Sequence, residues 1–164
     1  MTTNIQLARQ VARHVQLKYV TMKSAHIESA LPPDQPVSEP VSINQQHRCS
    51  FDEKLLDDRR DIHVTTEFRL QASKNASEKS ELVKLEVTFV LVYTLPLDAK
   101  YEPHCVQHFA ELNGVYNAWP YWREIVQSAT GRVGLGGIMV PVYRPVSAEV
   151  PEKPAPEPVA KSAQ

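Results

Sequence analysis

Residues 62–72, IHVTTEFRLQA, alternate between apolar and polar side chains along their whole length. One set of positions is Ile62, Val64, Thr66, Phe68, Leu70 and Ala72, and the set between them is His63, Thr65, Glu67, Arg69 and Gln71. Successive side chains of a strand point to opposite faces, so a period of two means one buried face and one solvent face. This segment therefore predicts a strand with one face in the core.

A second strand is predicted over residues 82–95. The polar link 73–80 is short enough for a hairpin turn, which would place the two strands antiparallel to each other. The odd positions from Leu85 to Leu95 are all apolar, whereas the even positions begin polar and become apolar at Val90 and Val92. One end of this strand is therefore apolar on both faces, and a helix, another subunit or a ligand is expected to cover the second face.

Two further strands are predicted upstream. Residues 15–29 are rich in alternating and β-branched residues and have room for a bulge; Leu17 and Tyr19 are assigned to one face, and Val20 and Met22 to the other. The proline-rich stretch 31–40 predicts a loop, because proline cannot donate to a sheet. Residues 41–51 predict the other strand, and residues 52–60 a charged linker.

Helical spacing appears on both sides of the strands. Ile5, Ala8, Val11, Ala12 and Val15 predict a short N-terminal helix capped by Asn4. The period becomes helical again from Pro103, is interrupted at Asn113-Gly114, and resumes over about residues 119–132 with Pro120 in the first turn. The apolar stripe that should cover the sheet is Trp119, Trp122, Ile125, Val126 and Ala129. The expected fold class is α+β, with a four-stranded antiparallel sheet and helices packed on one face.

The chain divides into three expected regions. These are an N-terminal helical extension over residues 1–14, a main domain over residues 15–144 that ends in a short extended segment at 138–143, and a tail over residues 145–164. The tail is predicted to be disordered because proline, alanine, glutamate and lysine dominate it.

Composition excludes several classes of protein. The chain has 164 residues, a net charge of -1 and two cysteines, which suits one ordinary domain without a disulfide framework. A near-neutral chain without a basic patch predicts no nucleic-acid partner. The apolar stretch at 87–97 is too short to cross a bilayer, and the N-terminus lacks a secretion signal, so a cytoplasmic protein without membrane insertion is expected.

Candidate catalytic and metal-binding residues are few. His104, Cys105, His108 and Glu111 could ligate zinc from one helix, but no matching Cys/His pair occurs elsewhere, so no metal is expected. The glycines at 131–137 follow a helix rather than open one, which excludes a phosphate loop. His63 with Glu67, or His104, are poor catalytic candidates. The sequence predicts no enzyme and no cofactor.

Aromatic residues concentrate where the second helix begins, beside the strand end that is apolar on both faces. Two interpretations fit: a contact within the core or between subunits, and a groove that binds extended apolar polypeptide by non-directional burial. The candidate polypeptide-binding residues are Val90, Val92, Tyr93, Tyr116, Trp119, Tyr121 and Trp122.

Residues 116–132, YNAWPYWREIVQSATGR, followed by the glycine-rich turn and IMVPV at 138–142, resemble the helical signature of the SecB family of bacterial chaperones. That signature has an aromatic or aliphatic residue before Pro-Tyr, then Arg-Glu, a later Ser or Thr, and an arginine near the end. In outline the resemblance covers residues 15–144. It implies a dimer of dimers, a homotetramer, that holds unfolded polypeptides in an apolar groove without ATP.

The resemblance leaves two roles open. Export members present acidic residues on the first strand to dock the export motor ATPase, and the stretch KSAHIE at 23–28 keeps only Glu28 as a docking residue. Other members guard labile antitoxins, and the N-terminal helix and proline-rich tail are similar in style to that branch. A small-molecule-binding α+β domain without catalysis is the alternative to both.

Overall fold

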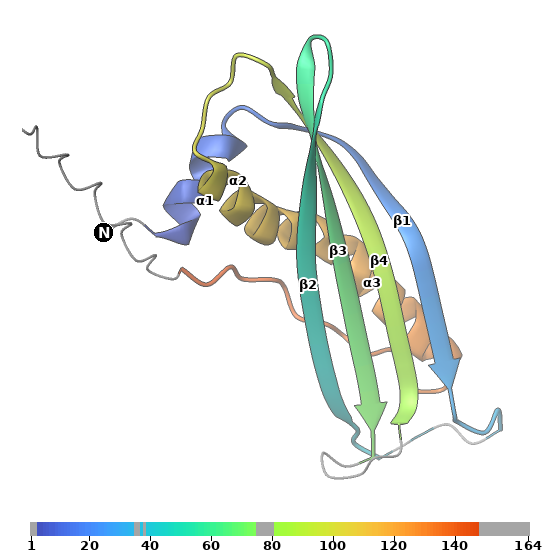
Figure 1. Ribbon diagram of the computed structural model, residues 1–164. Coiled ribbons are helices and arrows are strands. Elements are labelled where there is room, and N and C mark those ends of the chain that lie inside the picture. Colours follow the sequence, from blue (N-terminus) through green and yellow to red (C-terminus); the bar gives the residue numbers. More distant parts are fainter. Residues whose placement is uncertain (1–2, 35–36, 38, 75–80, 148–164) are drawn as a thin grey trace, which may run out of the picture.

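The computed structural model describes residues 3–34, 37, 39–74 and 81–147 (Figure 1). The elements are α1 (Asn4–Ala12), β1 (Gln16–Ser29), β2 (Ser42–Leu55), β3 (Arg59–Ser73), β4 (Glu81–Pro96), α2 (Pro103–Phe109), the π-helical turn η1 (Ala110–Gly114) and α3 (Val115–Arg132). Most of the predicted tail, from residue 148 onward, and most of the link at 73–80 lie outside the described residues.

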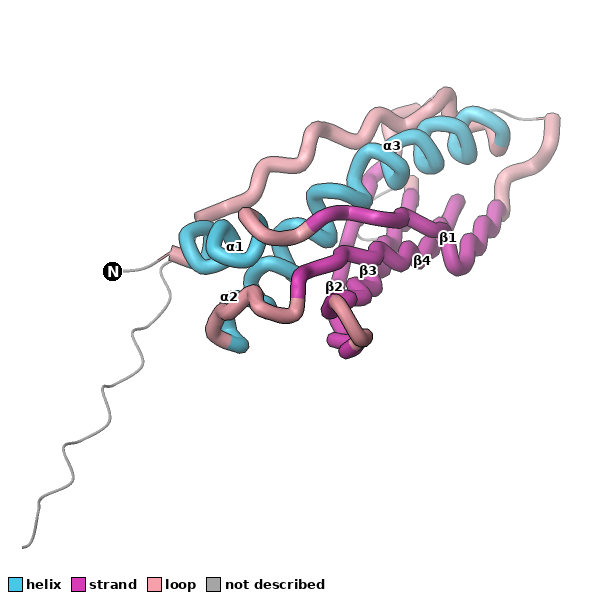
Figure 2. The backbone as a smooth tube through the Cα atoms, turned by 90° about the horizontal axis from the view of Figure 1, so that it is seen from above, coloured by secondary structure: helices cyan, strands magenta, loops and turns pink. Residues whose placement is uncertain are grey.

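The four strands form one sheet in the order β1-β4-β3-β2, and all neighbouring strands are antiparallel. The predicted alternation of β3 is confirmed, since Ile62, Val64 and Leu70 are fully buried. α3 lies across one face of the sheet, and the opposite face carries no helix (Figures 1 and 2). We call these the covered face and the open face; the α+β fold class is confirmed.

The strand register decides which residues share a face. Leu91 of β4 pairs with Val20 of β1 and Val64 of β3 on the covered face, whereas Val90 pairs with Thr21 and Thr65 on the open face. Because adjacent residues of β4 point to opposite faces, every partner along β1 can be assigned in this way.

The predicted bulge in β1 is confirmed and corrects the assignment of its faces. Register shifts fall between Leu17 and Tyr19 and between Met22 and Ser24. Leu17 pairs with Tyr93 and Tyr19 with Val92, so the two residues lie on opposite faces. An extra residue at a bulge inverts the alternation beyond it, and for this reason the assignment of Leu17 and Tyr19 to one face was wrong. Val20 and Met22 do share a face, as predicted, but it is the face of Leu17 and not the opposite one.

The charged linker predicted over residues 52–60 is wrong. β2 continues to Leu55 and β3 begins at Arg59, and the Leu56 N–H donates to the Arg59 carbonyl at 2.8 Å across a tight turn. Charged side chains do not prevent pairing here because both backbones complete a ladder, with Lys54 opposite Asp61.

The predicted break at Asn113-Gly114 and the helix start near Trp119 are also wrong. Helical backbone runs on from Pro103 to Arg132, with π-helical geometry over 110–114, and Pro120 lies inside α3. A β-carbon on Gly114 would lie 2.5 Å from Val64 Cγ1. The glycine therefore serves close helix–sheet packing rather than helix termination, and the burial of Val115 and Ala118 stabilises a first turn ahead of the proline.

α1 packs against α2 and belongs to the same core. Leu7, Ala8 and Val11 are buried, and Val11 is fully so. The cap is Thr3 rather than Asn4, because the Thr3 hydroxyl and the Gln6 side chain form a capping box. The predicted N-terminal helix is thus confirmed.

Candidate functional site

The covered face is filled by aromatic rings from the sheet and α3. Phe68 stacks on Trp122 with ring centroids 5.3 Å apart, and Trp119 meets Phe68 edge-on at 5.8 Å. Trp122 is fully buried, and Trp119 is 7% exposed. The space between helix and sheet is therefore packed core.

Beyond the margin of α3, apolar side chains of β1 on the covered face remain in solvent. Leu17, Met22 and Ile27 are 43%, 53% and 46% exposed, and Tyr121 of α3 is 50% exposed with its ring 6.2 Å from Phe89, the partner of Met22. We call these four residues the β1 strip. At about 3.3 Å per residue, the strip extends about 30 Å along β1.

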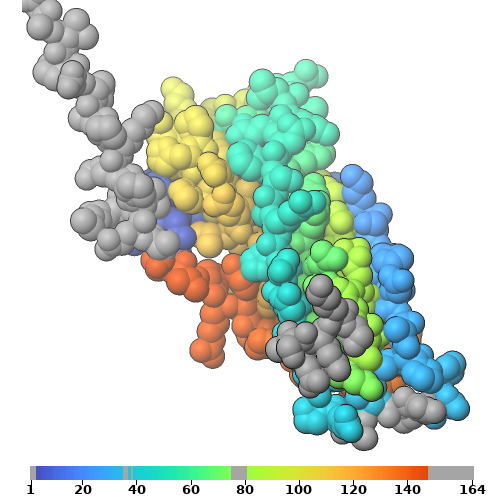
Figure 3. Space-filling model, turned by 60° about the horizontal axis from the view of Figure 1, so that its bottom comes forward, coloured from blue at the N-terminus to red at the C-terminus, as the bar shows by residue number. Residues whose placement is uncertain are grey.

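On the side of α3 away from the β1 strip, residues 138–147 return along the helix; we call them the strap (Figure 2). The Trp119 indole N–H donates to the Pro141 carbonyl at 2.8 Å, and Arg123 Nε donates to the Val140 carbonyl at 2.7 Å. The Tyr143 ring lies 5.0 Å from Trp119. In the space-filling view the strap, in orange, emerges beside β2 (Figure 3).

His47 of β2 completes this aromatic group. Its ring meets those of Trp119 and Tyr143 edge-on, with centroids 6.0 and 5.9 Å away. These rings withdraw part of the imidazole from water, and burial lowers the pKa of His47. The strap is therefore seated against a neutral, aromatic surface near neutral pH.

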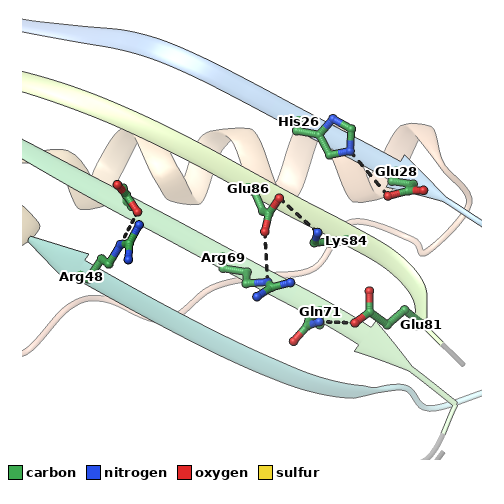
Figure 4. Close-up of polar contacts among 9 residues, drawn as sticks. His26, Glu28, Arg48, Arg69, Gln71, Glu81, Lys84 and Glu86 are labelled. Carbon is green, nitrogen blue, oxygen red and sulfur yellow. Dashed lines mark hydrogen bonds and ion pairs between the residues drawn. The ribbon is translucent and has the colours of Figure 1, made fainter. Parts of the chain in front are cut away.

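The open face carries several paired charges toward one end of the sheet, and Tyr19, Val90 and Val92 toward the other. Arg69 contacts Glu86 at 3.2 Å, Lys84 contacts the same carboxylate at 3.2 Å, and Arg48 pairs with Glu67 (Figure 4). A hollow of about 530 Å³ is lined in part by Arg48, Glu67, Arg69 and Glu86. Because opposite charges alternate, this face presents no single sign of charge to a partner.

The seven predicted polypeptide-binding residues do not form one surface. Val90 and Val92 lie on the open face, and Tyr93 lies on the covered face and is 1% exposed. Trp119 and Trp122 are buried, whereas Tyr116 and Tyr121 are exposed on α3. Tyr121 joins the β1 strip and Trp119 holds the strap. Leu17, Met22, Ile27 and Arg123 were missed because their roles depend on the bulges of β1 and the path of the strap.

Tyr93 is a buried titratable group. Its hydroxyl donates to the Asn113 carbonyl at 3.1 Å and accepts from Asn117 Nδ2 at 2.9 Å. Burial raises the pKa of Tyr93 to about 12, although the Asn117 hydrogen bond acts in the opposite direction. The folded state therefore keeps this proton at pH values where the unfolded chain loses it.

We expect the stability that Tyr93 contributes to be complete below pH 10 and to fall as pH rises from 10 toward 12, because the unfolded chain then binds fewer protons than the folded one. Urea unfolding between pH 8 and 12 measures this, with Tyr93→Phe as the comparison. The wild type should lose more stability than Tyr93→Phe over the upper half of that range; parallel losses would contradict the assignment.

The remaining candidates do not converge. His63 and Glu67 share the open face of β3 four residues apart, about 13 Å at strand spacing, and Glu67 is paired with Arg48. His108 contacts Glu111 at 3.6 Å, and Cys105 is buried against Gln10. Among the described residues, no three potential ligands gather for a metal ion. No helix in the described ranges is long and apolar enough to span a membrane.

Glu28, the predicted docking residue, lies at the end of β1 on the open face. Its carboxylate is 3.5 Å from His26 Nε2, and its strand partner is Lys84 (Figure 4). The one acidic residue kept in this stretch therefore stands among basic groups.

This sheet and helix arrangement defines a SecB-like fold, as comparison with solved structures shows. The chain is similar to the SecB-like chaperone Rv1957 of Mycobacterium tuberculosis, solved in complex with a ChAD peptide from the Rv1956 HigA1 antitoxin. The TM-score is 0.68 at 15% sequence identity, over 86% of this chain and 99% of that chain. No protein-family model and no curated protein matches the sequence. The resemblance seen in residues 116–142 is thus confirmed at the level of the fold.

Proposed function

We propose that this protein is an ATP-independent chaperone that binds extended apolar segments of non-native polypeptides. The observation that carries the proposal is the β1 strip, four large apolar side chains left about half exposed at the margin of a SecB-like fold. Val20 and Ala25 lie between these residues on the same face, so the strip is apolar along its length. A large exposed apolar patch is uncommon on monomers without a partner.

The strip has the dimensions for such a client. Its length of about 30 Å matches an extended segment of about nine residues. Burial contributes about 25 cal/mol per Å², so several hundred Å² of contact is needed to offset the cost of ordering a flexible chain. Repeated strips in one assembly would supply that area, which favours a homotetramer built as a dimer of dimers in the cytoplasm.

The client class that we favour is a labile antitoxin. The similar chaperone Rv1957 was solved with an antitoxin peptide. The paired charges of the open face and the basic surroundings of Glu28 do not suit docking of an export motor ATPase, although export remains the rival role. We propose no catalytic activity and no cofactor.

Replacing Met22 by aspartate is expected to reduce the suppression of aggregation of a denatured client severalfold, because a carboxylate in the β1 strip would be desolvated by the client. Thr21→Asp is the matched control, since it puts the same charge on the neighbouring residue of the open face. Light scattering without nucleotide measures the effect.

Solution mass separates this function from its alternative. A particle near four times 18.5 kDa that suppresses aggregation supports the chaperone. A stable monomer that leaves light scattering unchanged would contradict it and favour the small-molecule-binding domain. Equal activity of Met22→Asp and Thr21→Asp would instead place the client elsewhere on an active chaperone.

A further inference from the structure

The strap is an extended segment held to α3 through its backbone carbonyls. Trp119 and Arg123 stand one helical turn apart and donate to the carbonyls of two consecutive residues, Pro141 and Val140. Carbonyls are common to every polypeptide. These two hydrogen bonds therefore do not depend on the sequence of the segment that receives them.

Val140 of the strap faces the protein, whereas Met139, Pro141 and Val142 face solvent. Val140 is 4% exposed, whereas Met139 and Val142 are 65% and 66% exposed. Tyr143 then turns back onto Trp119. We call the surface under the strap, formed by Trp119, Arg123 and His47, the seat. The seat offers an extended apolar segment an aromatic surface, a place to bury one apolar side chain, and two hydrogen-bond donors.

Apart from the buried Val140 and the partly buried Ile138 and Tyr143, the strap has few contacts with the rest of the fold. Residues 138–147 belong to none of the four strands, and their further hydrogen bonds are from the Ile138 N–H to Thr130 Oγ1 at 2.7 Å and from Asn4 Nδ2 to the Val146 carbonyl at 3.4 Å. Segments with few buried contacts open at low free-energy cost without global unfolding.

We propose that the strap occupies in cis a seat that an extended apolar segment of a client takes in trans, with Trp119 and Arg123 donating to two consecutive client carbonyls. The inference rests on the proposed function. The two donors bind carbonyls, which proline also has, so the ligand is an extended apolar peptide in which proline is tolerated. The strap then competes with clients for the chaperone.

The test uses a fluorescent peptide with the sequence of residues 138–146, IMVPVYRPV, and the full-length protein. Val140→Asp is expected to release the strap and to raise peptide affinity roughly tenfold or more, because apparent affinity scales with the fraction of open seats. Val142→Asp is the matched control, with the same charge two residues away on an exposed side chain. Fluorescence anisotropy measures binding, and circular dichroism verifies folding.

Two further variants assign the donors. In the Val140→Asp protein, Trp119→Phe keeps an aromatic ring but removes the N–H, and Arg123→Ala removes the second donor; each should lower peptide affinity severalfold. If Val140→Asp does not fold, Val140→Ser replaces it in every comparison. Equal peptide affinity of the position 140 and 142 variants overturns the inference.

The aggregation assay distinguishes this failure from failure of the proposed function. Wild-type protein that suppresses aggregation, with no gain from release of the strap, leaves the chaperone function standing without competition by the strap. Wild-type and strap-released proteins that both fail to suppress aggregation contradict the chaperone function itself.

Discussion

Replacing Trp122 by alanine is expected to lower the free energy of unfolding by about 3–5 kcal/mol, the usual cost of truncating a buried large aromatic residue. Trp122 is fully buried and stacks on Phe68. A domain of this size has about 5–15 kcal/mol in total, so the variant would lose a large part of its stability. Urea unfolding followed by circular dichroism gives the value.

Two variants show whether this loss comes from packing. Tyr121→Ala removes a neighbouring aromatic ring that is 50% exposed, and it should cost less than about 1 kcal/mol. Trp122→Phe should cost less than alanine, because it keeps a ring and removes an indole N–H that has no hydrogen-bond partner among the described residues. Similar losses for Trp122→Ala and Tyr121→Ala would show that Trp122 is not a core residue.

Gly114→Val is expected to destabilise the protein by about 3 kcal/mol, at the upper end of the usual cost of overpacking. A β-carbon at this position would approach Val64 Cγ1 to 2.5 Å and Cys49 Sγ to 3.0 Å. Val64 is fully buried in β3 and has no space to move. The helix must therefore shift away from the sheet.

Gly131→Ala is the matched control within α3. Its β-carbon would meet only the Gly137 backbone, at 3.9 Å, so the substitution should be neutral or stabilising by up to about 1 kcal/mol. Val64→Ala should rescue part of the Gly114→Val loss by vacating the contested space. Additive losses in that double variant would contradict the steric explanation.

Trp122→Ala and Gly114→Val both test the packing of α3 on the sheet, and neither changes a residue of the β1 strip. The packed aromatic layer fixes α3 on the sheet. The exposed apolar side chains of the β1 strip then remain at its margin, and the strap lies along the other side of the helix. A rigid centre with apolar margins suits a protein that binds extended chains.

The candidate site could be predicted only in part. Tyr121 was found by sequence because aromatic residues cluster around Pro120. Leu17, Met22 and Ile27 were not grouped, since two bulges shift the faces of β1. Trp122 is an aromatic residue of the kind that binds apolar polypeptide, yet it belongs to the core, because the sheet places Phe68 against it.

The sequence by itself determined that four strands and flanking helices exist and that the class is α+β, but not where β2, β3 and α3 begin and end. Apolar residues recur along the sequence with the period of the strand or helix that they form, so the alternation in residues 62–72 is enough to predict a strand. Only the tertiary structure decided that β1 lies beside β4, that Gly114 touches Val64 and that the strap returns along α3. These features join residues far apart in the chain, and no local period records such pairings.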